Sequence, residues 1–370
     1  MPSEKEACSV SIELLPEFGW SIGGQPVYGP GSVFQGYVKV KCLENLPLES
    51  IRVAFYAVET IPPFDIHFGT LRTAKNTLFS VQLTLWDSKK NDTLSFDQDD
   101  GTTRLPFIIQ MPMVQFPPSL SHTLYRCDFQ LIAMVNTSSE IIKTERSVLC
   151  MPYVETHLLK TPMMISVNKS SLSAQLKMSA TEFVPSDSIS LSLHVGQLGT
   201  SKRTEYVTVQ LKLIRTVTIK IFDDIPDDEK TVASALHKLL LIPTSSNGSY
   251  CDGDFTLQLP ADLSPSCDYG NMVNISYRLQ VKVEQKGPLG GIWNYTTAFE
   301  DIPVTIGTLG YGIRLSDEFN TYSQYKIGDN NRLVDVPVPK FMKTIEYEDA
   351  LPLYDSVRLP DYDLITAITC

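Results

Sequence analysis

Residues 27–38 read VYGPGSVFQGYV, a turn built on Gly-Pro-Gly that leads into a strand of alternating apolar and polar residues. Residues 182–191, EFVPSDSISL, repeat this arrangement, since an aromatic residue, one further residue and a proline again precede an alternating strand. Proline suits such a turn because its ring fixes φ at about −65°. Period-two alternation is typical of a strand that buries one face. The same turn and strand therefore open both halves of the chain.

A second feature also occurs twice, in the same order and again about 150 residues apart. Pro117-Pro118-Ser119 leads into a strand that contains Tyr125, and Ser264-Pro265-Ser266 leads into a strand that contains Tyr277. Self-similarity at one fixed offset indicates a duplicated structural unit. We expect Tyr125 and Tyr277 to occupy equivalent strand positions when the two halves are superposed.

Strand patterns separated by turn signals cover most of the chain. Antiparallel sandwiches have this pattern, whereas a parallel α/β sheet alternates strands with long helices. At 370 residues the chain also exceeds what one core usually organises. We therefore predict an all-β fold with β-sandwiches at residues 1–155 and 156–310 and a tail at 311–370. Residues Asp227–Leu240 fit a helix of about three turns and a strand equally well.

Three of these segments resemble the arrestin amino-terminal domain, namely residues 28–38, Pro117-Pro118-Ser119 and the strand Tyr125-Arg126-x-x-Phe129. Their counterparts, with Tyr277-Arg278, resemble the arrestin carboxy-terminal domain. The resemblance covers roughly residues 8–310. It is strongest to the α-arrestins, the arrestin-related trafficking adaptors, and weaker to the visual and β-arrestins. It implies two tandem arrestin-like, immunoglobulin-type β-sandwiches with a flexible C-terminal tail.

The formal charge of −11 argues against a nucleic-acid-binding protein, because a phosphate backbone is bound by a basic surface. The sequence has no stretch of about 18 apolar residues that could span a bilayer. Its first residues also carry charges where a signal peptide has an apolar core. We therefore expect a cytoplasmic protein that associates with membranes only peripherally, through its partners.

The seven cysteines are dispersed, and no two form a C-x-x-C pair. In a cytoplasmic protein this pattern predicts seven reduced thiols, and neither a disulfide framework nor a zinc site. Glycosylation sequons leave a secreted β-sandwich open as an alternative. The six N-x-[ST] sequons lie at Asn91, Asn136, Asn168, Asn247, Asn274 and Asn294.

The sequence contains no recognisable catalytic or metal-binding motif. The five histidines have no H-x-x-x-H spacing, and neither a P-loop nor a dinucleotide-binding fingerprint is present. The acidic runs Asp97–Asp100 and Asp223–Glu229 lack the spacing of a calcium-binding loop. We therefore expect no enzymatic activity, no cofactor and no metal.

Two tetrapeptides of the form L-P-x-Y lie within twelve residues near the carboxyl end, and both are variants of the P-P-x-Y ligand of WW domains. Proline keeps such a peptide close to polyproline II, so it loses little entropy on binding. The proline then fits between two aromatic rings of the WW domain while the tyrosine fills an adjacent pocket. The predicted ligand residues are Leu351, Pro352, Tyr354, Leu359, Pro360 and Tyr362.

In α-arrestins, WW-containing HECT ubiquitin ligases dock on such a tail. The resemblance thus implies an adaptor whose sandwiches select integral membrane cargo and whose tail recruits a ligase, so that the cargo is ubiquitinated, endocytosed and sorted. The adaptor would move from the cytoplasm to the plasma membrane and endosomes. Two alternatives stay open: a retromer-like arrestin-fold coat subunit, which does not need the WW ligands, and a non-enzymatic β-sandwich binding module.

Overall fold

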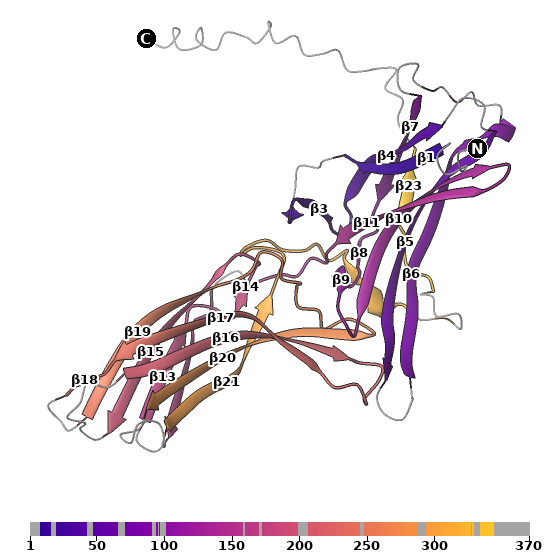
Figure 1. Ribbon diagram of the computed structural model, residues 1–370. Coiled ribbons are helices and arrows are strands. Elements are labelled where there is room, and N and C mark those ends of the chain that lie inside the picture. The colour runs from indigo at the N-terminus through magenta and orange to yellow at the C-terminus, as the bar shows by residue number, and fades with distance from the viewer. Residues whose placement is uncertain are drawn as a thin grey trace, which may run out of the picture.

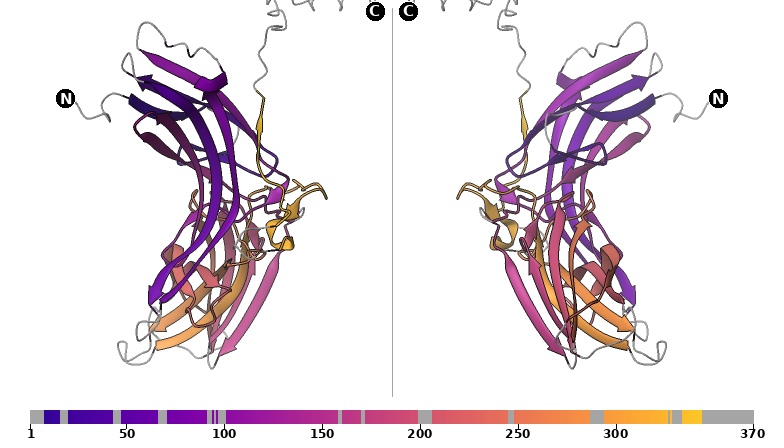
Figure 2. Two further views of the ribbon diagram at one scale, coloured as in Figure 1. Left: turned by 90° about the vertical axis from the view of Figure 1, so that its right-hand side faces the viewer. Right: turned by 90° about the vertical axis from the view of Figure 1, so that its left-hand side faces the viewer.

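Two β-sandwiches lie end to end in the computed structural model (Figures 1 and 2). The structure describes residues 8–15, 20–42, 47–65, 71–90, 94, 96, 101–157, 160–169, 172–198, 206–244, 248–286, 294–326, 328 and 334–343. Helical structure within these residues is limited to two 3-10 turns, η1 (Ser88–Lys90) and η2 (Tyr322–Gln324). The prediction of an all-β fold of tandem sandwiches is therefore confirmed.

The first sandwich contains two sheets. One has the strand order β1 (Cys8–Leu14), β4 (Val33–Cys42), β7 (Thr102–Gln110) and β23 (Lys340–Met342). The facing sheet has the order β2 (Ser21–Ile22), β3 (Gln25–Tyr28), β11 (Ile141–Cys150), β10 (Arg126–Thr137), β5 (Leu48–Asp65) and β6 (Leu71–Asp87), and β9 (Leu120–Ser121) pairs with β10.

The second sandwich begins after a connection at residues 151–162 and also contains two sheets. One has the order β12 (Met163–Lys169), β13 (Leu172–Met178), β15 (Ser188–Leu198), β19 (Gly248–Gln258) and β18 (Ile242–Pro243). The other has the order β14 (Glu182–Phe183), β21 (Asn294–Ile306), β20 (Val273–Lys286), β16 (Tyr206–Ile219) and β17 (Asp228–Leu240).

The two sandwiches share one topology. Strands β1, β4 and β7 correspond to β13, β15 and β19, and β3-β11-β10-β5-β6 corresponds to β14-β21-β20-β16-β17. Even the short parallel pairing recurs, because Cys150 pairs with Tyr28 and Ile306 pairs with Phe183. The chain is a duplicated sandwich, as the repeated sequence features predict.

The opening turn is the same in both halves. Gly31 and Ser186 have left-handed φ values of 75° and 71°. The Gly31 N–H donates to the carbonyl oxygen of Pro112 at 3.0 Å, and the Ser186 N–H donates to that of Pro260 at 3.3 Å. Glycine adopts this conformation freely, whereas serine does so only when its surroundings hold it there. The matching turns confirm the first of the two predicted repeats.

The Pro-Ser segments also match in their hydrogen bonds. The Ser119 N–H donates to the Cys150 carbonyl oxygen at 2.8 Å, and the Ser119 Oγ accepts from the Cys150 N–H at 2.9 Å. In the second sandwich, Ser266 makes the same pair of bonds with Ile306, at 2.8 and 3.0 Å. Each serine therefore satisfies the last backbone groups of a strand, β11 in one half and β21 in the other.

The expected equivalence of Tyr125 and Tyr277 is wrong. Cys127 pairs with Leu120, and Ile275 makes the corresponding bridge to Cys267, so Cys127 and Ile275 are equivalent. Tyr125 precedes the first of these by two residues, whereas Tyr277 follows the second by two. Side chains two residues apart share one face of a strand, so an aromatic residue can fill the core from either position. The duplication is therefore supported by the matching turns at Gly31 and Ser186 and by Ser119 and Ser266.

Residues Asp228–Leu240, for which the sequence allows a helix or a strand, form β17. The strand pairs with β16 in antiparallel register, with Val209 opposite His237. Without β17, the edge of β16 would expose its backbone hydrogen-bonding groups to solvent. This pairing extends from Tyr206 to Val217 of β16, and local apolar spacing does not encode such contacts between strands.

The segment after residue 310 contradicts the expectation of a flexible tail as far as its described residues reach. Strand β22 (Asn320–Thr321) pairs with β8 (Val114–Gln115), and β23 pairs with β7, with Phe341 opposite Ile109. Figure 2 shows this yellow segment running back from the second sandwich to the first. We call residues 311–343 the C-terminal segment. Paired pieces of two or three residues are too short to produce a recognisable period in sequence.

The cysteines differ from the prediction at one pair. Cys8 and Cys42 lie opposite each other on β1 and β4 and form a disulfide, so the expectation of seven reduced thiols is wrong. The sequence does not show the strand register that brings them together. Cys370 lies outside the described residues. The remaining four, Cys127, Cys150, Cys251 and Cys267, are free and buried, and burial raises the pKa of each thiol.

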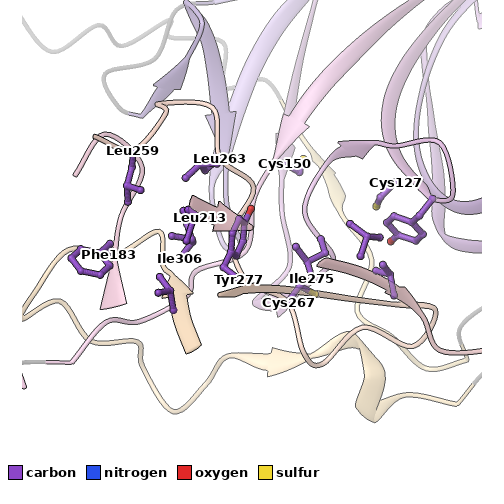
Figure 3. Packing of buried hydrophobic residues seen from close by; sticks show 14 of the residues in the cluster. Cys127, Cys150, Phe183, Leu213, Leu259, Leu263, Cys267, Ile275, Tyr277 and Ile306 are labelled. Carbon is purple, nitrogen blue, oxygen red and sulfur yellow. The ribbon is translucent and has the colours of Figure 1, made fainter. Parts of the chain in front are cut away.

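The buried apolar residues of both sandwiches form one continuous cluster. In β13, for example, Leu172, Ala174, Leu176 and Met178 are buried while the residues between them face solvent. Figure 3 shows the part of this cluster where Cys127 of the first sandwich approaches Cys267 and Ile275 of the second. The two cores are thus packed together at their junction.

Candidate functional site

The six predicted WW-ligand residues lie outside the described residues, so their role stays a prediction. They are Leu351, Pro352, Tyr354, Leu359, Pro360 and Tyr362. The last described strand before them, β23, ends at Met342 on the edge of the first sandwich. The first motif therefore begins nine residues beyond a docked strand.

The described chain does contain one buried polar site, centred on Glu59 of β5. Residues Ile51, Val53, Phe55 and Ala57 precede it on the buried face of the same strand, and Glu59 is itself 0% exposed. The strand register places Glu59 between Cys127 of β10 and Asn76 of β6. A carboxyl group therefore occupies a position where alternation requires an apolar side chain.

Three side chains donate hydrogen bonds to this carboxyl group. The Tyr125 hydroxyl donates to Oε1 at 2.7 Å, the Tyr322 hydroxyl donates to the same atom at 3.0 Å, and Asn76 Nδ2 donates to Oε2 at 2.9 Å. Burial raises the pKa of Glu59, and these three hydrogen bonds partly oppose that rise because they favour the charged form. The arrangement satisfies a carboxyl group that would otherwise be costly to bury.

Tyr322 extends this network into the second sandwich. Its ring is buried on η2 of the C-terminal segment, and its hydroxyl accepts from the Asn271 N–H at 2.8 Å. Beside it, the Tyr269 hydroxyl donates to the Phe116 carbonyl oxygen at 2.9 Å. One chain of hydrogen bonds therefore joins the first sandwich, the C-terminal segment and the second sandwich.

Two contacts with aspartate carboxylates join the sandwiches nearer the surface. Arg72 of β6 donates to Asp224 Oδ2 through Nε at 3.0 Å and Nη2 at 2.8 Å. The Leu124 N–H donates to His122 Nδ1 at 3.2 Å, which leaves the ring proton on Nε2, 2.8 Å from Asp228 Oδ2. The exposed Arg72 pair adds little stability because solvent screens it, so these contacts mainly fix orientation.

The C-terminal segment also contacts the connection between the sandwiches. Glu155 Oε1 accepts from the Leu315 N–H at 2.5 Å, and Glu155 Oε2 accepts from Arg314 Nη1 at 2.8 Å. The Thr156 hydroxyl donates to the Leu309 carbonyl oxygen at 2.9 Å. These bonds hold the start of the C-terminal segment against the connection between the two sandwiches.

A pocket of about 590 Å³ opens beside this network. It is lined by residues of both sandwiches, of the connection and of the C-terminal segment, and we call it the junction pocket. In the described part of the chain, no group of three or more His, Cys, Asp or Glu side chains is arranged to hold a metal ion. The helical turns of the described residues are too short and too polar to cross a bilayer.

Sequence reasoning missed the Glu59 site, although one signal for it is present. The strand pattern of residues 51–61 alternates apolar residues up to Ala57 and then places Glu59 in the same phase. An ionisable residue in the buried phase of a strand indicates a partnered polar site. Nothing local to Tyr322 indicates its role, because its partner lies far away in the chain.

Comparison with known protein families agrees with this architecture. Residues 168–311 match the family model of arrestin (or S-antigen), C-terminal domain. The match runs from the first strands of the second sandwich to just beyond β21. No curated protein matches the chain. The second sandwich thus matches an arrestin C-terminal domain, and the first sandwich repeats its topology, so the fold is that of two tandem arrestin-like sandwiches.

Proposed function

We propose that this chain is a non-enzymatic trafficking adaptor of the α-arrestin type. It would link integral membrane cargo proteins to a WW-domain HECT ubiquitin ligase and thereby promote cargo ubiquitination, endocytosis and sorting. One observation carries the proposal, namely that an arrestin C-terminal domain and two L-P-x-Y motifs occur in the same chain. An arrestin fold alone supports an adaptor, and the motifs specify the class of partner.

The motifs suit a WW domain for physical reasons. Pro352 and Pro360 favour polyproline II, the backbone conformation that WW domains bind, so little entropy is lost on docking. Tyr354 and Tyr362 each stand two residues after the proline, where the tyrosine pocket is reached. Leucine in place of the first proline keeps an apolar contact but gives up some preorganisation. We expect weaker binding than a full P-P-x-Y ligand would have.

The position of the motifs in the chain also fits an adaptor. Leu351 is the ninth residue after the end of β23, and such a stretch spans at most about 32 Å. A ligase bound at the first motif would therefore stay close to the first sandwich. In this proposal the sandwiches select the cargo, the protein works in the cytoplasm, and it reaches the plasma membrane and endosomes through that cargo.

Binding of the full-length chain to a tandem pair of WW domains from a HECT ligase tests the proposal. The double variant Tyr354→Ala/Tyr362→Ala should lose binding, because the tyrosine pocket is left empty at both motifs. Tyr347→Ala is the matched control, since Tyr347 lies just before the motifs and outside the L-P-x-Y pattern. Equal binding by the wild type and the double variant would contradict the proposal.

A further inference from the structure

The junction pocket has walls from four parts of the chain. Gln115 lies on the first sandwich, Glu155 on the connection, Ser276 on the second sandwich and Phe319 on the C-terminal segment. A volume of about 590 Å³ is within the range of small-molecule binding sites. A ligand in this pocket would touch all of these parts at once.

The charges around the pocket favour a cation. Among the described residues that line it, none is Lys, Arg or His, whereas Glu155 and Asp268 are acidic. Hydrogen bonds from Leu315 and Arg314 hold the pKa of Glu155 below its usual range, so this carboxylate stays ionised and Arg314 partly balances its charge. No described donor bonds to the Asp268 carboxylate itself, although Lys220 Nζ donates to the Asp268 backbone carbonyl oxygen at 3.0 Å and partly balances its charge from outside the lining.

Aromatic rings make up much of the remaining wall. Tyr153 and Phe319 pack edge to face, with ring centroids 5.8 Å apart and an interplanar angle of 77°. Tyr269 and Tyr277 also line the pocket, and their hydroxyls already donate to backbone carbonyl oxygens at 2.9 and 2.6 Å. The half-buried Tyr269 ring remains for contact with a ligand, whereas the Tyr277 ring is only 4% exposed and packs mainly in the core. The negative face of an aromatic ring attracts a cation, and most strongly where water is excluded.

We propose that the junction pocket binds a small organic cation, an ammonium group carried on an apolar body. The ammonium group would lie between Asp268 and the aromatic rings, and the apolar body would contact Ile275 and Val304. An anion such as a phosphate is disfavoured, because the lining offers no basic side chain to meet it. This site is independent of the WW-ligand motifs, so either proposal can fail without the other.

A matched pair of probes tests the proposal on the full-length chain. Choline carries a quaternary ammonium, and 3,3-dimethyl-1-butanol has the same shape without the charge. Choline should bind with a millimolar Kd, and the neutral analogue about three- to thirtyfold more weakly, because it lacks the attraction to the rings and to Asp268. Ligand-observed NMR titration measures both affinities. Equal affinity of the two probes, or no binding of choline, would overturn the proposal.

Three variants locate the binding to this pocket. Asp268→Asn should weaken choline binding about three- to tenfold and leave the neutral probe unchanged. Asp262→Asn is the control, because Asp262 is an exposed carboxylate of the same loop that does not line the pocket. Ser276→Trp should fill the pocket and abolish binding of both probes. Thermal melts by circular dichroism confirm that each variant is folded. Choline binding unchanged in Asp268→Asn and in Ser276→Trp would place the site elsewhere and refute the proposal.

Discussion

The Tyr322 hydroxyl lies 3.0 Å from Glu59 Oε1, although 263 residues separate the two in the chain. Glu59 belongs to the buried face of the first sandwich, and Tyr322 belongs to the C-terminal segment that follows the second. The same hydroxyl accepts from the Asn271 N–H of the second sandwich. One side chain therefore couples the positions of both domains and of the segment that leads to the predicted ligase motifs.

Tyr322→Phe should destabilise the protein by about 1–3 kcal/mol. The variant removes one donor to Glu59 Oε1 and leaves the partly buried Asn271 N–H without its acceptor. The ring itself is kept, so no cavity is created. Urea unfolding of the wild type and the variant measures the loss.

Tyr325→Phe is the control for that experiment. Tyr325 lies three residues later in the same segment and packs against the core, but its hydroxyl makes no hydrogen bond with any described residue. It should change the free energy of unfolding by less than about 0.5 kcal/mol. A loss as large as that of Tyr322→Phe would show that the network around Glu59 has no special role in stability.

The free energy of unfolding should fall as pH rises, because Glu59 loses its proton over this range. Folding raises the pKa of this carboxyl above its ordinary value of 4.5, so the folded chain holds the proton more tightly than the unfolded chain. The stability that Glu59 contributes is fully present below about pH 4.5 and is lost as pH rises through the folded pKa.

Glu59→Gln removes this titration. Over the range from about pH 4.5 upward, the wild type should therefore lose stability relative to Glu59→Gln and then level off. Urea unfolding at a series of pH values gives the difference. Glu49→Gln, which makes the same substitution at an exposed position at the start of the same strand, is the matched control. A difference between wild type and Glu59→Gln that stays constant with pH would contradict the prediction.

Reduction of the Cys8–Cys42 disulfide should lower stability by about 3–4 kcal/mol, because the bond closes a stretch of 34 residues in the unfolded chain. Thiol titration of the denatured protein should find two more thiols after treatment with dithiothreitol than before. The double variant Cys8→Ala/Cys42→Ala should melt at the same temperature with and without the reductant. If the melting temperature of the wild type is the same with and without dithiothreitol, the bond does not form in solution.

The repeated features of the fold are predictable from sequence because each depends on local residues. The turns at Gly31 and Ser186 follow the same aromatic-x-Pro pattern, and their hydrogen bonds match. Ser119 and Ser266 follow a proline in both halves and bond to the end of a strand in each. These are short-range arrangements, so a short stretch of sequence is enough to identify them.

Register and distant partners are not predictable in this way. Tyr125 and Tyr277 look equivalent in sequence, yet strand pairing places them on different sides of the equivalent pair Cys127 and Ile275. The Cys8–Cys42 bond has the same origin, because only the pairing of β1 with β4 brings the two residues together. Tyr322 reaches its partner by folding of the whole chain. Such long-range contacts leave no periodic signal in the sequence.

The two predicted WW-ligand motifs should bind one WW domain at a time. Pro352 and Pro360 are eight residues apart, a distance of at most about 28 Å in a fully extended chain. Two WW domains with their ligands would be crowded over this span. We expect each motif to bind with a Kd of about 10–100 μM, in line with a few buried side chains. A peptide with both motifs should bind only about two- to fivefold more tightly, because the second motif mainly adds a place for rebinding.

Calorimetry with a tandem pair of WW domains distinguishes rebinding from bivalent binding. The peptide 340–370 is compared with the variants Tyr354→Ala and Tyr362→Ala, each of which keeps one motif. A two-motif peptide that binds a hundredfold more tightly than either variant would contradict the crowding argument and indicate a bivalent clamp. Phosphorylation of Tyr354 or Tyr362 should abolish binding at that motif, because a charge of about −2 cannot be desolvated in the tyrosine pocket. Each phosphopeptide should therefore match the alanine variant at the same position, so that charge and loss of the ring have the same consequence.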